Sequence, residues 1–144
     1  MLANQIGYYS LILGLLLSVL LCAVSIKDFN NTSKQINQKV LSLSFLQLVF
    51  IIVSFLSLIL SFINSDFSNE TVFNNSHTTK PLFYKISGTW GNHEGSLLLW
   101  LLVLTLFIFL FLIKSREQPK KYRILTLLFQ QIIIIGFFLF VLLT

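Results

Sequence analysis

The chain has 144 residues, of which 56% are hydrophobic and 10% are charged, with a formal net charge of +5 and a mean hydropathy of +0.85. A soluble domain carries about 25% charged residues, so this chain has too few charges to cover a water-facing surface. The numbers exclude a soluble enzyme and a free nucleic-acid binder, and the high apolar content excludes a disordered chain. The composition predicts an integral membrane protein of at most one domain.

Four apolar stretches follow one another along the chain, at residues 8–26, 40–63, 95–113 and 124–144. Each comes close to the roughly 20 residues that a helix needs to cross a bilayer, and none contains Asp, Glu, Lys or Arg. Lipid cannot satisfy an open sheet edge, and the alternation of period two expected of barrel strands is absent. We therefore expect an all-α, polytopic membrane protein with four transmembrane helices, in which residues 1–144 form a single segment.

The connections between the stretches predict the topology. The short connections 27–39 and 114–123 together hold eight of the ten Lys and Arg residues, whereas the long connection 64–94 holds two. The positive-inside rule places the two short connections in the cytoplasm or matrix and the long one on the opposite side. The positive net charge then follows from topology and contact with anionic lipid, and it does not indicate a nucleic-acid partner.

The apolar stretches contain one cysteine and three glutamines. Cys22 is the only cysteine, so an internal disulfide and a cysteine-based metal cluster are excluded, and we expect this side chain to pack. The main polar groups at depth are Gln47, Gln130 and Gln131, and we expect the last two to pair one helix with another. A composition rich in Phe, Ile, Asn and Lys but poor in Ala and Arg indicates an AT-rich genome, such as that of an organelle or a reduced bacterium.

The long connection ends in the one distinctive motif, PLFYKISGTWGNHEGSLLLW at residues 81–100. Its glycines permit tight turns and close backbone approach. Asn92 or Ser96 is expected to cap the third helix, and Glu94 in the first turn would favour its N-terminal dipole. Residues alone therefore indicate a capped helix start behind an interfacial turn that carries Trp90.

The residues give less support to a catalytic or metal-binding role of the motif than to a structural one. His93 and His77 make a poor zinc site, because no further histidine and only one cysteine is present. A general acid–base pair of His93 and Glu94 is chemically reasonable, but adjacent residues on a helix do not face each other. We therefore predict no catalytic residue and no metal site in this chain.

The run GTWGNHEGSLLLW, preceded by PLFYK, resembles the N-terminal part of the CcmF family, the membrane haem lyase of cytochrome c maturation. The first stretch, GYYSLILGLLLS, is also similar, and the order of spans and loops fits over nearly the whole chain. The resemblance marks a family motif made up of Trp90, Gly91, His93, Glu94 and Gly95. We assign these residues a positional role rather than iron ligation or nucleophilic chemistry.

The resemblance implies a role in attaching haem to the two cysteines of a CxxCH sequence in apocytochrome c, with haem delivered by a chaperone. The family's haem-ligating histidines lie further along a full-length protein, so haem is expected to be handled by the whole complex and not ligated by this chain. We expect an N-terminal piece of a divided lyase that is not catalytic alone, in a mitochondrial inner membrane or, alternatively, a bacterial one. The expected partners are the remaining lyase parts, the haem chaperone, apocytochrome c and the bilayer.

Two alternatives stay open from the sequence. A structural subunit of a respiratory or transport complex would share the composition, although such subunits usually carry charged residues inside their spans for ion paths. A haem lyase dedicated to nitrite reductase is a close relative of the first reading, and the sequence does not separate the two.

Overall fold

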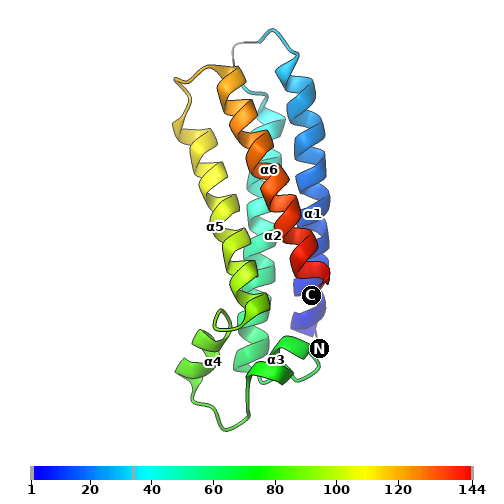
Figure 1. The fold of residues 1–144 in the computed structure, drawn as a ribbon, viewed down its shortest axis with the longest axis vertical. Helices are drawn as coiled ribbons and strands as arrows, with labels where there is room; N and C mark the ends of the chain where they lie inside the picture. Colours follow the sequence, from blue (N-terminus) through cyan, green and yellow to red (C-terminus); the bar gives the residue numbers. More distant parts are fainter. Residues whose placement is uncertain (1, 34, 144) are drawn as a thin grey trace.

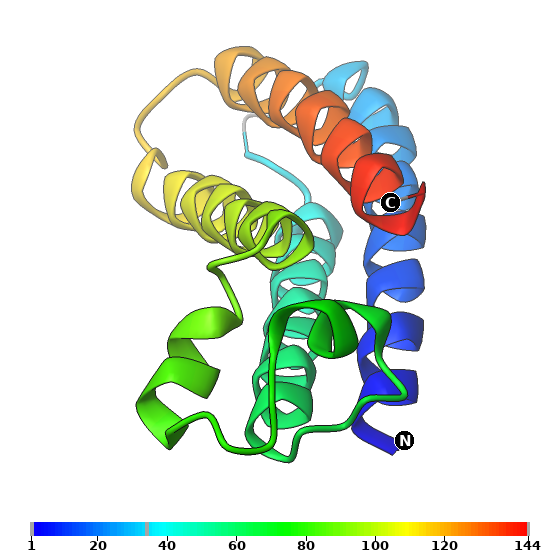
Figure 2. The same cartoon turned by 60° about the horizontal axis from the view of Figure 1, so that its bottom comes forward.

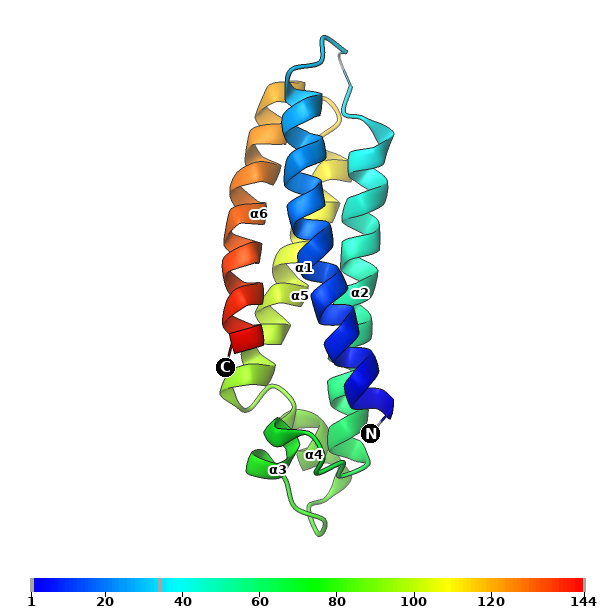
Figure 3. The ribbon, with the colours of Figure 1, turned by 90° about the vertical axis from the view of Figure 1, so that its right-hand side faces the viewer.

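The computed structural model describes residues 2–33 and 35–143, and these residues form helices joined by turns, with no strand among them. Four long helices, α1 (Leu2–Phe29), α2 (Gln38–Ile63), α5 (His93–Lys114) and α6 (Lys120–Leu143), run up and down in alternation as an elongated bundle (Figures 1 and 3). By length and composition, each of the four is able to cross a membrane. The predicted all-α, four-span architecture is confirmed.

The helices extend beyond the predicted stretches 8–26, 40–63, 95–113 and 124–144, most of all at the start of α1 and of α6. The predicted stretches contain no charged residue, and most of them end beside a charged residue or Asn64. Polar side chains at a helix end can reach the interface or pair with a neighbour, so the helical backbone continues past the apolar core. With 28 residues at about 1.5 Å each, α1 is longer than the roughly 30 Å hydrocarbon layer.

The connection expected as a simple loop at 64–94 contains two short helices, α3 (Glu70–Asn75) and α4 (Leu82–Gly88). They cover one end of the bundle, at which the start of α1 and the end of α6 also lie (Figures 1 and 2). We call this end the long-loop end and the opposite one the short-loop end. Asn69 caps α3 by accepting from the backbone N–H of Thr71 at 3.0 Å, and its amide donates to Asn4 of α1 at 2.8 Å.

Small residues let α1 approach its neighbours closely. A Cβ added to Gly7 would lie 3.0 Å from the Cβ of Ser57 on α2, and one added to Gly14 would lie 2.8 Å from the Phe138 ring on α6. Membrane helices have no water-driven hydrophobic force to hold them together, so their association relies on such close packing and on interhelical hydrogen bonds.

A buried polar cluster crosses the middle of the bundle. Gln47 and Gln131 exchange hydrogen bonds of 3.0 and 3.2 Å through their amides, and the hydroxyl of Ser18 donates to Gln131 at 2.8 Å. Gln47 also donates to Ser18 at 2.6 Å, which links α1, α2 and α6. The predicted helix-to-helix pairing is confirmed for Gln131. Within the described residues the half-buried side chain of Gln130 makes no hydrogen bond.

Charged residues close the short-loop end. Lys120 and Asp28 form an ion pair of 2.9 Å between the start of α6 and the end of α1, and both side chains are less than 10% exposed. The guanidinium of Arg123 donates to the Ser115 hydroxyl at 3.0 Å and to the carbonyl of Leu112, an arrangement that satisfies the C-terminal end of α5. Two of the basic residues used above to predict the topology therefore also hold the helices together at this end of the bundle.

Candidate functional site

The family motif forms the turn between α4 and α5 at the long-loop end. The side chain of Asn92 links the two helices across this turn. Its Oδ1 accepts from the backbone N–H of Gly95 at 2.7 Å, and its Nδ2 donates to the backbone carbonyls of Gly88 and Thr89 at 2.8 and 3.2 Å. The cap predicted at Asn92 is confirmed. Ser96, the alternative cap, instead donates to the carbonyl of His93 at 2.8 Å.

Of the motif glycines, Gly95 is the one that the turn requires. A Cβ added there would lie 1.6 Å from the carbonyl oxygen of Thr89, a distance at which backbone must move. A Cβ added to Gly91 would lie 3.4 Å from the Ser87 carbonyl oxygen, which is an ordinary contact. None of the described glycines has a positive φ, so close approach explains Gly95 and conformational freedom does not.

The other motif residues point in different directions. The imidazole of His93 is exposed and packs edge-on against the Phe140 ring of α6, with the ring centres 6.0 Å apart. Glu94 is half-buried and lines a cavity. Trp90 is 42% exposed at the surface. The structure therefore does not bring His93 and Glu94 together as an acid–base pair.

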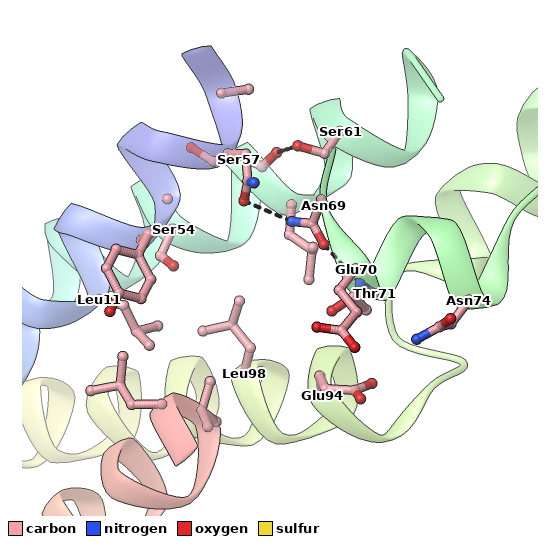
Figure 4. Close-up of a pocket in the computed structure, with 17 residues that line it drawn as sticks. Leu11, Ser54, Ser57, Ser61, Asn69, Glu70, Thr71, Asn74, Glu94 and Leu98 are labelled. Atoms are coloured by element: carbon pink, nitrogen blue, oxygen red, sulfur yellow. Dashed lines mark hydrogen bonds between the residues drawn. The ribbon is translucent and has the colours of Figure 1, made fainter. Parts of the chain in front are cut away.

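The cavity beside Glu94 has a volume of about 230 Å³ and lies between the long-loop ends of α1, α2, α5 and α6, with α3 along one side. Figure 4 shows Glu70 of α3 and Glu94 of α5 directed into the same space, while Ser54 and Ser57 line the side of α2. Further polar lining comes from α1, α2 and the start of α3, and the apolar part of the wall includes Leu11, Leu58, Leu98, Val141 and Leu142.

Sequence reasoning did not find this cavity. Its polar lining comes from segments far apart in the chain, and Glu70 had no role in the motif. One available signal was the helical repeat of Ser54, Ser57 and Ser61, which puts three hydroxyl groups on the face of α2 turned toward the bundle.

The expectation of no metal site concerned His93 and His77, and the structure leaves both exposed. Among residues 2–33 and 35–143, no three His, Cys, Asp or Glu side chains gather in a way that could hold a metal ion. The single cysteine, Cys22, is free and half-buried in α1.

Four long apolar helices in antiparallel order, a structured segment over one end and a basic opposite end define a multi-pass membrane protein. Comparison with known proteins refines this class. No family model matches the chain. The cytochrome c-type biogenesis protein CycK of Bradyrhizobium diazoefficiens is 39% identical over 96% of this chain and 21% of its own length. CcmF of Haemophilus influenzae is 33% identical over 97% of this chain and 22% of its own length.

The fold supports the same relationship. A solved structure of the cytochrome c haem lyase CcmF superposes with a TM-score of 0.83 at 25% identity, covering 94% of this chain and 23% of that one. The chain belongs to the cytochrome c-type biogenesis family of CycK and CcmF and corresponds to its N-terminal part. It spans about a fifth of the length of these relatives. Both named relatives are bacterial, so they give no support to the mitochondrial location expected above.

Proposed function

We propose that the chain acts in cytochrome c maturation as the N-terminal membrane part of a haem lyase. The observation that carries the proposal is the continuous similarity to CycK over 96% of the chain, together with the superposition on CcmF. The relatives are biogenesis proteins, whereas the alternative of a respiratory or transport subunit has no comparable support.

The geometry supports a scaffolding role. The motif residues serve the turn and its packing: Gly95 admits the Thr89 carbonyl, Asn92 caps α5 and His93 packs on Phe140. We assign none of them to catalysis. Haem attachment, the apocytochrome substrate and the haem chaperone belong in this proposal to the assembled lyase, and haem is not ligated by this chain.

The remaining lyase parts are the first partner that we propose. Gln130 lies in the middle of the apolar part of α6 and has no hydrogen-bond partner among the described residues. An amide left unpaired at bilayer depth is costly, so a polar group on a neighbouring membrane helix would stabilise it. Gln130 therefore marks a position on α6 at which we expect the rest of the lyase to contact this chain.

We place the chain in a bacterial inner membrane, with the long-loop end in the periplasm and the short-loop end in the cytoplasm. The charge distribution supports this orientation, because both short connections carry the excess of Lys and Arg. The motif then lies on the side where we expect haem and apocytochrome c to meet.

Affinity purification tests the partnership. A tagged chain isolated from gently solubilised membranes of its own cells should recover the rest of the lyase, and Gln130→Leu should reduce that recovery while Phe129→Leu, a change on the neighbouring exposed position, should not. Recovery of respiratory or transport subunits in place of lyase parts would contradict the proposal.

A further inference from the structure

We expect the cavity at the long-loop end to lie near the depth of lipid head groups. Its lining includes Tyr8 near the start of α1, and Tyr8 and Tyr9 are both mostly exposed, as interfacial aromatic residues are. The first turn of α5 and the last residues of α6 complete it. A cavity at this position is within reach of the polar part of a phospholipid and of the upper part of its acyl chains.

The cavity is lined by two acidic side chains and by no basic one. Glu70 and Glu94 both line it, and no lysine, arginine or histidine does. The two cations of the long connection bond elsewhere, since Lys80 donates to the carbonyl of Asn75 at 3.1 Å and Lys85 donates to the hydroxyl of Ser65 at 2.6 Å. Glu70 is exposed and Glu94 is half-buried, so a cation that enters the cavity would meet two carboxylates and no fixed cation that competes with it.

Two serine hydroxyls that line the same cavity also lack hydrogen-bond partners among the described residues. Ser54 is 4% exposed and lines the cavity, yet its hydroxyl makes no hydrogen bond among the described residues. Ser57 is 6% exposed, and its hydroxyl also makes no hydrogen bond among the described residues. The hydroxyl of Ser61, in contrast, donates to the backbone carbonyl of Ser57 at 3.0 Å. Both hydroxyls line the cavity and are open to it, so they are available to form hydrogen bonds with a ligand.

We propose that this cavity binds the head group of an aminophospholipid of the phosphatidylethanolamine type. The primary ammonium group donates hydrogen bonds to Glu70 and Glu94, because it carries three N–H donors and a matching charge. The serine hydroxyls, the Tyr8 hydroxyl and the Asn74 amide supply donors for the phosphate oxygens. The leucines and valine of the wall accommodate the upper acyl chain.

Size and chemistry narrow the ligand to this class. A volume of about 230 Å³ is below the range of about 300–1,000 Å³ typical of sites for drug-sized molecules, so the cavity takes a head group rather than a larger ligand. A choline head group keeps the charge but has no N–H to donate. A phosphatidylglycerol head group would bring a negative charge to two carboxylates. The inference does not depend on the function proposed above.

Native mass spectrometry of lipids retained by the purified 144-residue chain tests the proposal. The chain is first placed in bilayers with equal amounts of phosphatidylethanolamine and phosphatidylcholine. We expect about tenfold enrichment of phosphatidylethanolamine in the bound fraction, the factor for one charge-assisted hydrogen bond. Enrichment should fall stepwise across the N-monomethyl, N-dimethyl and choline lipids, which lose one N–H donor at a time. Equal retention of all four head groups would overturn the proposal.

Two variants locate the effect. The double change Glu70→Gln and Glu94→Gln should abolish the enrichment, whereas Glu117→Gln, on the exposed short-loop end, should leave it unchanged. Enrichment that survives the double change in a chain with native helix content would overturn the assignment. The lipid series above needs no protein change, so it decides the question if the double variant does not fold.

A basic side chain from the rest of the lyase is the competing occupant. The same measurement on the chain purified with the remaining lyase should still show enrichment of phosphatidylethanolamine. Loss of the enrichment in that complex would show that a protein cation fills the cavity, and the lipid proposal would be wrong.

Discussion

Replacing Gly95 by alanine is expected to destabilise the long-loop end of the bundle. The added Cβ would lie 1.6 Å from the Thr89 carbonyl oxygen, so either the turn or the start of α5 must move. Overpacking of this kind costs about 1–3 kcal/mol, and displacement would also break the cap from Asn92, worth about 1 kcal/mol. Alanine regains at most about 1 kcal/mol of helix propensity. The net loss is therefore about 1–3 kcal/mol.

The assay is unfolding of the purified chain in mixed micelles, followed by the loss of helical circular dichroism as the denaturing detergent increases. Gly91→Ala is the matched control, because its Cβ would make only an ordinary contact and the change should stay within about 0.5 kcal/mol of the native chain. The reasoning fails if the two alanine variants unfold at the same midpoint.

The remaining predictions concern the bundle core, the motif and the topology. Gln131→Leu should destabilise the chain by about 1–2 kcal/mol in the same unfolding assay, because it removes the donor to the buried Gln47 carbonyl and the acceptor of the Ser18 hydroxyl, and adding Gln47→Leu should recover part of the loss; a second loss of the same size would contradict this. His93→Gln should retain most of the holocytochrome c yield in haem-stained gels, since a positional role needs no basic group, and complete loss at normal protein level would refute that role. A cysteine at Thr78, which is exposed, should react with an impermeant thiol reagent from the periplasmic side, whereas one at Gln118 should not; the reverse pattern would invert the topology.

Much of the fold could be predicted because lipid leaves few choices for apolar stretches of this length. The cap at Asn92 was also predictable, since an Asx residue directly before an apolar run is a helix-start signal. The ends of the spans were predicted less well. Asp28, Lys120 and Arg123 were assigned to connections, but ion pairing and hydrogen bonding keep them in the helices. Their partners lie on other helices and cannot be identified from local sequence.

Contacts between distant segments account for what the sequence did not show. The pairing of Gln131 was predictable in kind, because an amide at bilayer depth needs a partner, but its partner Gln47 lies 84 residues away. The short helices α3 and α4 span six and seven residues, too few for a periodic pattern. The cavity joins Ser54, Glu70 and Glu94 from three elements, and no spacing along the chain predicts that they meet.

The content of c-type cytochromes in cells that lack this chain tests the central claim most directly. Haem-stained gels of membranes from a deletion strain, and from the same strain carrying the gene on a plasmid, give the measurement, with b-type cytochromes as the internal control. A haem lyase part predicts that holocytochrome c disappears on deletion, returns with the plasmid and leaves b-type cytochromes unchanged. Normal holocytochrome c in the deletion strain would contradict the account.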